Sequence, residues 1–368
     1  MRLASMGIAL AVAASGCWVR VAPDDPRLRY TGRVDRSDPA GPRFSYTASA
    51  VAVRVDSSAL RLHLREVPYP DRPKDLAAPG TNRYELVVDG RPASVLTAPG
   101  PEWRHTVELG PGEHVVELFK RTEPEVGQGQ LLDLELPLGA RLLPPPERPE
   151  RRIELIGDSL TAGFGNLGPG PGCPFTAATE DGYRSYATLA ARMLRAEAHI
   201  VAWSGRGVVR NYDLDSIGVI PQLFERTLPE DAASRWDFSR WTPHAVVIFA
   251  GQNDFGRPDL DIAKFEQGYV QLVTEVRRRY PQALILCAYP SVTDDWPENM
   301  RYGTLSREAM DRVIKALAEA GVTRLQTFTL DHRPGPGDGL GCLWHPSLPT
   351  HEAMAERLRS IVAGAMGW

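Results

Sequence analysis

Four positions between residues 159 and 345 of this 368-residue chain have the residue types that acyl transfer by a serine requires. Ser159 stands in Gly-Asp-Ser, Gly205 in Ser-Gly-Arg-Gly, Asn253 in Gly-Gln-Asn-Asp and His345 in Trp-His-Pro. A serine hydroxyl attacks a carbonyl carbon when a histidine accepts its proton, and N–H groups must then stabilise the oxyanion. Taken alone, Gly-Asp-Ser is more often a turn that caps a helix, and a lone histidine is more often a surface or core residue.

The segments around these positions predict a parallel sheet. Short apolar runs alternate with segments of helical period, such as 186–194 and 310–318, the second of which ends before Gly321. The runs are 153–156, 200–203, 245–250, 283–288 and 325–330. Continuous apolar strands that alternate with helices predict an α/β domain whose sheet is covered on both faces. Since such strands end at one edge of the sheet, the four chemical residues are expected together there.

Residues 24–146 show a different pattern, with hydrophobic residues at every second position. The runs span 50–55, 60–64, 84–90, 106–109, 114–119 and 131–136. They are separated by Gly, Pro, Asp and Ser turns, and Val88-Asp-Gly-Arg91 is a hairpin signal. Such spacing predicts an all-β, antiparallel sandwich domain. The Pro-rich segment 142–149 then predicts a stiff linker, and residues 151–368 have the length of one α/β domain.

The first 17 residues have the layout of an export signal. Met1-Arg2 is positively charged, 3–14 is a small-residue apolar run too short to span a membrane, and Ala14-Ser-Gly-Cys17 follows. This tetrapeptide resembles a bacterial lipobox, although leucine is commoner than alanine at its first position. We therefore expect an exported protein, periplasmic or at the cell surface, anchored to a bacterial membrane by a lipid on Cys17. A plain cleavable signal is the alternative.

The other three cysteines have different surroundings. Cys287 lies in an apolar run and is expected to be a buried thiol. Cys173 and Cys342 lie in loops rich in Gly and Pro, where an exported protein is expected to form a disulfide. They have no metal-ligand spacing to each other or to a pair of histidines, so no metal site is expected.

The composition is that of an ordinary globular protein. Of the 368 residues, 43% are hydrophobic and 24% charged, and the chain is long enough for two cores. The net charge of −4 is mild and no long basic stripe occurs, so no nucleic-acid partner is expected. We expect a monomer.

Together, the blocks around the four chemical residues resemble those of the SGNH (GDSL-type) hydrolases, in order and at the usual separations across the whole C-terminal domain. The resemblance implies a three-layer, flavodoxin-like fold in which Ser159 is the nucleophile and His345 the general base. It also implies an oxyanion hole made by the N–H groups of Ser159 and Gly205 and by the side-chain amide of Asn253.

Further motifs resemble carbohydrate esterase family 2. They are Phe119-Lys-Arg-Thr-Glu123, Cys173-Pro-Phe with Thr179-Glu180 and Ser185-Tyr186, Ser204-Gly-Arg-Gly207 with Arg210-Asn-Tyr212, and Gly341-Cys-Leu-Trp-His-Pro-Ser347 with Thr350-His351. The resemblance spans nearly the whole chain after the leader. It implies a jelly-roll-like sandwich joined to an SGNH domain, and removal of acetyl groups from polysaccharides such as xylan and glucomannan. It implies neither a metal nor an organic cofactor.

One position departs from the SGNH pattern. Most SGNH enzymes have an aspartate three residues before the histidine, and here Cys342 stands there, followed by Leu343. Neither side chain can orient and stabilise the imidazole as a carboxylate does. Some members of the resembled family work as a Ser-His dyad with a backbone carbonyl orienting the ring, and we expect that arrangement here. A bond from Cys342 to Cys173 would stiffen the histidine loop. The alternatives are a distant acid such as Asp338 and impaired catalysis.

Four aromatic residues near the blocks are candidates for sugar contact: Trp203, Tyr212, Trp296 and Trp344. An exposed loop tryptophan invites a functional explanation, and Trp344 lies beside the histidine. Trp203 ends a strand and is expected to pack in the core instead. Substrate contacts are therefore expected from Trp344, Trp296 and Tyr212.

Three functions from different classes fit these residues. The first is an exported esterase that removes O-acetyl groups from a polysaccharide through an acetyl-enzyme on Ser159. The second keeps this chemistry on another substrate, as a general carboxylesterase or an acyltransferase on envelope glycans. The third is a non-catalytic, glycan-binding lipoprotein whose site has lost its acid. The intact Ser159, Asn253 and His345 speak against the third.

Overall fold

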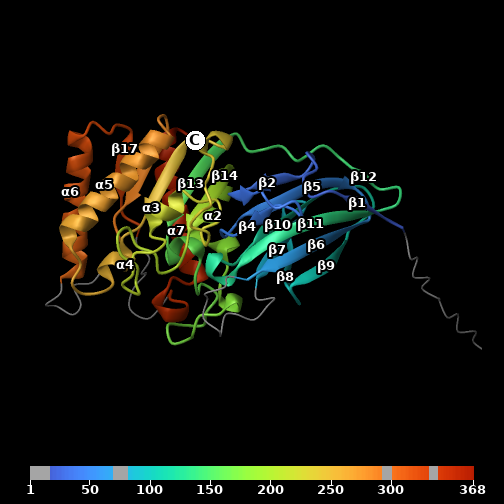
Figure 1. Ribbon diagram of the computed structural model, residues 1–368, viewed down its shortest axis with the longest axis horizontal. Helices are drawn as coiled ribbons and strands as arrows, with labels where there is room; N and C mark the ends of the chain where they lie inside the picture. The colour runs from blue at the N-terminus through green and yellow to red at the C-terminus, as the bar shows by residue number, and fades with distance from the viewer. Residues whose placement is uncertain (1–16, 69–81, 292–300, 331–338) are drawn as a thin grey trace, which may run out of the picture.

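The computed structural model describes residues 17–68, 82–291, 301–330 and 339–368. An all-β unit built by the N-terminal part and an α/β unit built by the C-terminal part lie side by side (Figure 1). The predicted fold class, a jelly-roll-like sandwich followed by a three-layer parallel-sheet domain, is confirmed. The leader up to residue 16, the sugar-contact candidate Trp296 and the alternative acid Asp338 lie outside the described residues.

Two antiparallel sheets form the all-β unit. The first has the order β3 (Val34–Asp35), β4 (Arg43–Phe44), β11 (Gln128–Pro137), β6 (Ala59–Val67) and β9 (Glu102–Glu108), with β1 (Trp18–Val21) on β11. The second has the order β12 (Arg141–Leu142), β5 (Ala50–Asp56), β10 (Glu113–Lys120), β7 (Arg83–Val88) and β8 (Arg91–Thr97), with β2 (Arg29–Thr31) on β5. Every run that alternation predicted overlaps one of these strands, and only the runs 84–90 and 106–109 extend past the strand end.

Alternation and turn chemistry account for these strands. In β6, Leu60, Leu62 and Leu64 are buried between the sheets, while Arg61 and Arg65 are half-buried on the other side. Successive side chains of a strand point to opposite faces, so one face of β6 supplies the core. The predicted hairpin joins β7 to β8, and its turn residues Asp89 and Gly90 both have positive φ, as a tight hairpin requires.

The α/β unit has five parallel strands in the order β14 (Ala196–Ala202), β13 (Arg151–Gly157), β15 (Ala245–Phe249), β16 (Leu284–Ala288) and β17 (Leu325–Phe328). Its α-helices are α1 (Ser159–Ala162), α2 (Tyr186–Met193), α3 (Ile220–Phe224), α4 (Gln252–Phe255), α5 (Ile262–Arg279), α6 (Tyr302–Glu319) and α7 (Leu348–Met366). Short 3₁₀ helices span Pro124–Val126, Ala177–Thr179, Gly182–Arg184, Phe238–Arg240 and Cys342–Trp344. The strands β14 and β15 lie on opposite sides of β13, so the strand order reverses at β13. Such a reversal creates the crevice where open α/β folds bind ligands.

Helices cover both faces of the parallel sheet, as predicted. One apolar cluster joins α3, α5 and α6 to one face, and another joins α2 and α7 to the other. Both faces of the sheet are therefore buried, which is why its strands read as continuous apolar runs. Helix α6 ends before Gly321, whose φ of 75° is left-handed, as its predicted C-terminal position requires. Among the described helices, none is long and apolar enough to cross a membrane.

Buried polar contacts join the two units. Arg33, from the loop between β2 and β3, pairs with Glu154 of β13 at 3.0 Å, and both side chains are fully buried. The Arg33 guanidinium also donates to the carbonyls of Phe224 and Arg226. Tyr46 donates its hydroxyl hydrogen to the carbonyl of Leu223 at 2.9 Å. Breaking a buried ion pair leaves an uncompensated charge, so this junction fixes how the sandwich sits on the sheet.

Candidate active site

The nucleophile candidate Ser159 lies where β13 ends and α1 begins. Asp158 caps this helix by accepting a hydrogen bond from the N–H of Leu160 at 3.1 Å. A Cβ at position 157 would come within 2.1 Å of the Thr161 hydroxyl oxygen, so this tight turn requires Gly157. The strand end and the helix cap together present Ser159 at the carboxyl edge of the sheet.

His345 contacts both the serine and its own backbone. Its Nε2 lies 2.8 Å from the Ser159 hydroxyl oxygen, and its Nδ1 lies 2.9 Å from the carbonyl oxygen of Leu343. A carbonyl only accepts, so Nδ1 carries the hydrogen and Nε2 is free to accept the serine proton. The geometry is that of a nucleophile, a base and an orienting group. No described carboxylate hydrogen-bonds Nδ1, and the orienting group is the backbone carbonyl that the dyad hypothesis requires.

The histidine loop has an unusual backbone. Leu343 and Trp344 both have positive φ, 50° and 65°, which is the left-handed region that non-glycine residues rarely adopt. This turn brings the Leu343 carbonyl back toward the imidazole two residues later. Sequence reasoning gave no signal for it, because neither residue type favours that conformation. Such backbone persists where the surrounding structure holds it.

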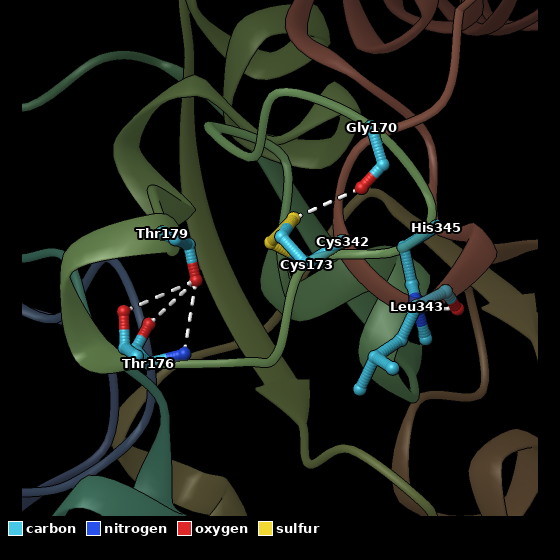
Figure 2. The surroundings of a disulfide bond; sticks show 7 residues. All are labelled: Gly170, Cys173, Thr176, Thr179, Cys342, Leu343 and His345. Carbon is cyan, nitrogen blue, oxygen red and sulfur yellow. Dashed lines mark hydrogen bonds between the residues drawn. A yellow bond between two sulfur atoms is a disulfide. The ribbon is translucent and has the colours of Figure 1, made fainter.

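Several contacts hold the histidine loop in place. A disulfide joins Cys173 to Cys342, with an S–S distance of 2.11 Å, directly beside Leu343 and His345 (Figure 2). The N–H of Cys342 donates to the carbonyl of Gly165 at 2.9 Å, which ties the loop to the segment after Ser159. The ring of Phe164 packs against the imidazole, with ring centroids 4.5 Å apart. These contacts therefore hold the loop of His345 against the segment that follows Ser159.

The oxyanion side of the site comes from the loops after β14 and β15. Gly205 has a φ of 74° and, with Ser159 and Asn253, lines the same cleft. The Asn253 amide nitrogen donates to Asp158 at 3.0 Å and to the carbonyl of Arg206 at 2.9 Å. Both of its hydrogens thus have partners in this state. An oxyanion would have to share or displace one of these bonds to receive the predicted contact from Asn253.

Asp254 organises the same loop from behind. Its carboxylate accepts hydrogen bonds from the N–H groups of Val208, Val209 and Arg210, at 2.7, 2.9 and 3.1 Å. Burial raises the pKa of Asp254 to about 6, and the three N–H groups act in the opposite direction. Asp254 follows Asn253 in the Gly-Gln-Asn-Asp block, so that block supports the Gly205 loop as well as supplying a donor candidate.

Burial perturbs two further groups in the site. It lowers the pKa of His345, and the backbone carbonyls of Leu343 and Cys342 act in the opposite direction. It raises the pKa of Asp158 to about 7, and the neighbouring Asp254 charge raises it further. A histidine that is neutral at pH 7 suits a general base.

A cleft of about 800 Å³ opens above Ser159 and His345. Trp344 and Tyr212 line it and are 65% and 48% exposed, so two of the predicted sugar contacts are available to a ligand there. Trp203 is buried, as expected of a core residue, although it also borders the cleft. The remaining lining residues are Glu125, Phe164, Ser204, Arg206, Asp213, Asp215 and Leu343. Glu125 comes from the sandwich, so both units form the cleft wall.

Two predictions remain, one for the cysteines outside the disulfide and one for metal binding. Cys287 is a buried free thiol, and burial raises its pKa to about 12. Cys17 is exposed and precedes β1 directly. The parts of the chain that the structure describes hold no group of three or more His, Cys, Asp or Glu residues arranged to bind a metal ion.

Comparison with known proteins places each half in a family. Residues 30–146 match the Carbohydrate esterase 2 N-terminal model, and residues 155–353 match the GDSL-like Lipase/Acylhydrolase family. The Cellulase/esterase CelE of Acetivibrio thermocellus is 34% identical over 94% of this chain, and the chain spans only 40% of that protein. An Acetylxylan esterase / glucomannan deacetylase of Cellvibrio japonicus is 26% identical over 95% of this chain and 91% of its own.

Solved structures agree with these matches. A family two carbohydrate esterase from Clostridium thermocellum, in complex with cellohexaose, is 32% identical and has a TM-score of 0.83. The similarity covers 93% of this chain and 99% of that one, so it includes both the sandwich and the parallel-sheet unit. With the Ser-His geometry, the two matched models and this overlap, the chain belongs to carbohydrate esterase family 2, within the GDSL-like hydrolases.

Proposed function

We propose that this protein is an exported serine esterase that removes O-acetyl groups from a polysaccharide. One observation carries the proposal: His345 Nε2 lies 2.8 Å from the Ser159 hydroxyl oxygen, while Nδ1 is held by a backbone carbonyl. The family relatives named for acetylxylan and glucomannan suggest an acetylated xylan or glucomannan as the substrate class.

The reaction has two halves. His345 accepts the Ser159 proton as the serine oxygen attacks the acetyl carbonyl carbon, and a tetrahedral oxyanion forms. The protonated imidazole then gives its proton to the departing sugar oxygen, which leaves an acetyl group on Ser159. Water, deprotonated by His345, attacks this acetyl-enzyme, and acetate leaves as Ser159 regains its proton. The N–H groups of Ser159 and Gly205 and the Asn253 amide are the proposed donors to the oxyanion.

A backbone carbonyl replaces the missing acid in this mechanism. The Leu343 oxygen selects the tautomer in which Nδ1 holds the hydrogen, which is one role of the aspartate in a triad. It carries only a partial charge, so it stabilises the imidazolium less than a carboxylate would. The disulfide and the Phe164 contact supply the positional order around the ring.

The cleft suits a polar polymer with flat sugar rings. Trp344 and Tyr212 offer exposed aromatic faces, while Glu125, Asp213 and Asp215 offer hydrogen-bonding groups around them. Ligand sites commonly combine aromatic walls with a few oriented polar groups. We propose that Trp344 and Tyr212 contact the pyranose units next to the acetylated one.

The N-terminus supports export and attachment to a membrane. Cys17 is exposed and β1 starts at the next residue, Trp18. A lipid on Cys17 would hold the edge of the sandwich at the membrane surface without a spacer. Labelling with a radioactive fatty acid tests this step, with Cys17→Ser as the control. Unlabelled wild-type protein in the soluble periplasmic fraction would refute the anchor.

Acetate release tests the activity. Wild-type protein should release acetate from acetylated xylan or glucomannan and p-nitrophenol from p-nitrophenyl acetate. Ser159→Ala and His345→Ala should abolish both. Ser347→Ala is a matched control, since Ser347 lies two residues after His345 and its hydroxyl contacts Thr350 rather than the imidazole. Undiminished release by Ser159→Ala would refute the assignment. Release from p-nitrophenyl acetate but from no acetylated polysaccharide would refute the substrate class alone.

A further inference from the structure

A short segment of the sandwich unit enters the α/β unit behind the Gly205 loop. Residues 120–123 begin at the last residue of β10, and all four side chains are buried. The Lys120 ammonium donates to the carbonyls of Thr122 and Glu123, at 2.7 and 3.0 Å, and Arg121 pairs with Asp181 at 2.6 Å. The segment is thus fixed on both sides before it reaches the catalytic loops.

Glu123 is the residue of this segment that touches the site. Its fully buried carboxylate accepts hydrogen bonds from the backbone N–H of Ser204 at 2.6 Å and from the Ser204 hydroxyl at 2.5 Å. The N–H of Glu123 itself donates to Glu180 at 3.1 Å. Ser204 directly precedes Gly205, and both line the cleft. A side chain from one unit therefore holds the residue beside a proposed oxyanion donor in the other.

Both oxygens of the Glu123 carboxyl group contact Ser204. One accepts from the backbone N–H and the other from the hydroxyl, so two hydrogen bonds fix this residue. Burial raises the pKa of both Glu123 and Glu180, and the negative charge of Glu123 raises that of Glu180 further, whereas the Ser204 bonds lower that of Glu123.

The Gly205 N–H lies between two anchors. Glu123 fixes Ser204 on one side, and the Asn253 amide fixes the carbonyl of Arg206 on the other. The peptide unit that joins Ser204 to Gly205 is planar, so the direction of its N–H depends on the torsions at these two residues. Gly205 has no Cβ to restrict its own torsions, and its φ is 74°. The Gly205 carbonyl accepts a hydrogen bond from the N–H of Tyr212 at 2.8 Å, and the anchors on Ser204 and Arg206 add further order to this glycine.

We propose that Glu123 is a positioning residue for the oxyanion hole, through which the sandwich unit aims the Gly205 N–H at the reacting carbonyl. The inference rests on the esterase chemistry proposed at Ser159. It gives the sandwich a direct part in the reaction rate, separate from any part in binding sugar.

Steady-state kinetics on p-nitrophenyl acetate test the proposal. Glu123→Gln should lower kcat by about 10–100-fold, less than the loss of a whole donor, with KM within about three-fold of wild type because Glu123 does not touch the substrate. Ser204→Ala keeps the backbone bond to Glu123 and should show a smaller fall. Tyr46→Phe is the matched control, because it removes another buried hydrogen bond between the units, to Leu223, and should leave kcat within about two-fold.

Hydrogen exchange of the same variants gives a readout that does not depend on turnover. Amides of residues 204–210 should exchange faster in Glu123→Gln than in wild type, and at the wild-type rate in Tyr46→Phe. A wild-type kcat in Glu123→Gln, or an equal fall in Tyr46→Phe, would overturn the proposal. Faster exchange in Glu123→Gln together with an inactive wild type would keep the positioning role and reject the proposed esterase function instead.

Discussion

The Nδ1 hydrogen of His345 is donated to the carbonyl oxygen of Leu343, two residues earlier in the chain, at 2.9 Å. This contact leaves Nε2 facing the Ser159 hydroxyl at 2.8 Å. The site therefore obtains its tautomer from the path of the main chain rather than from a carboxylate side chain.

Substitutions of Leu343 test this dependence on the backbone. Leu343→Gly should keep kcat on p-nitrophenyl acetate within about two-fold, because glycine adopts positive φ without strain. Leu343→Val should lower both kcat and the thermal midpoint, since a β-branched residue fits the left-handed region more poorly than leucine does. Equal activity of the two variants would contradict the role given to the Leu343 carbonyl.

The pH dependence of the rate should report His345. Burial lowers its pKa from the usual 6.5, and only the neutral imidazole accepts the serine proton. The value of kcat/KM should therefore fall as the pH drops through the lowered pKa of His345. A pH–rate profile with p-nitrophenyl acetate gives the midpoint. A midpoint above 6.5 would contradict the lowered pKa of His345.

Loss of the disulfide should weaken both stability and rate. The bond joins residues 169 positions apart, and bonds of this kind typically stabilise a protein by about 2–4 kcal/mol. Cys173→Ser/Cys342→Ser should unfold at lower denaturant concentration and have a reduced kcat, because the histidine loop loses its fastening to the segment near Ser159. Urea titrations with and without a reductant check the assignment: the reductant should affect wild type and leave the double variant unchanged.

The role of Asn253 as an oxyanion donor predicts a loss of turnover with little loss of binding. Asn253→Ala should lower kcat by about 100–1,000-fold, as expected for removal of one donor. Gln252→Ala is the control, since Gln252 precedes it in α4 and also contacts Asp158, at 3.4 Å. An unchanged kcat in Asn253→Ala would mean that the Asn253 amide serves only Asp158 and Arg206.

The strands and helices with clear periodicity could be predicted from the sequence. The sandwich runs and all five parallel strands were found, because burial of one or both faces leaves a repeated pattern. Strands β1, β2, β3, β4 and β12 were missed, since each has only two to four residues and no period can be seen over so few. Strand β8 was indicated only by the hairpin signal before it, because its residues are nearly all exposed. Their pairing depends on neighbouring strands rather than on their own side chains.

The site was predicted to the level of its motifs. Ser159 and His345 were indicated by their blocks, and a backbone carbonyl was expected beside the imidazole. The sequence did not indicate which carbonyl, because this depends on positive φ at Leu343 and Trp344. The existing partners of the Asn253 amide were not predicted either, since they come from loops after two other strands.

The Arg33–Glu154 pair makes the two units poor candidates for separate inheritance. Glu154 belongs to the central part of the parallel sheet, and cutting the chain at the linker would leave its buried carboxylate without the arginine. An α/β unit transferred alone by recombination would then contain a buried charge without a partner. In the match to the Cellulase/esterase CelE, 94% of this chain aligns within 40% of a larger protein, so both units are aligned there together.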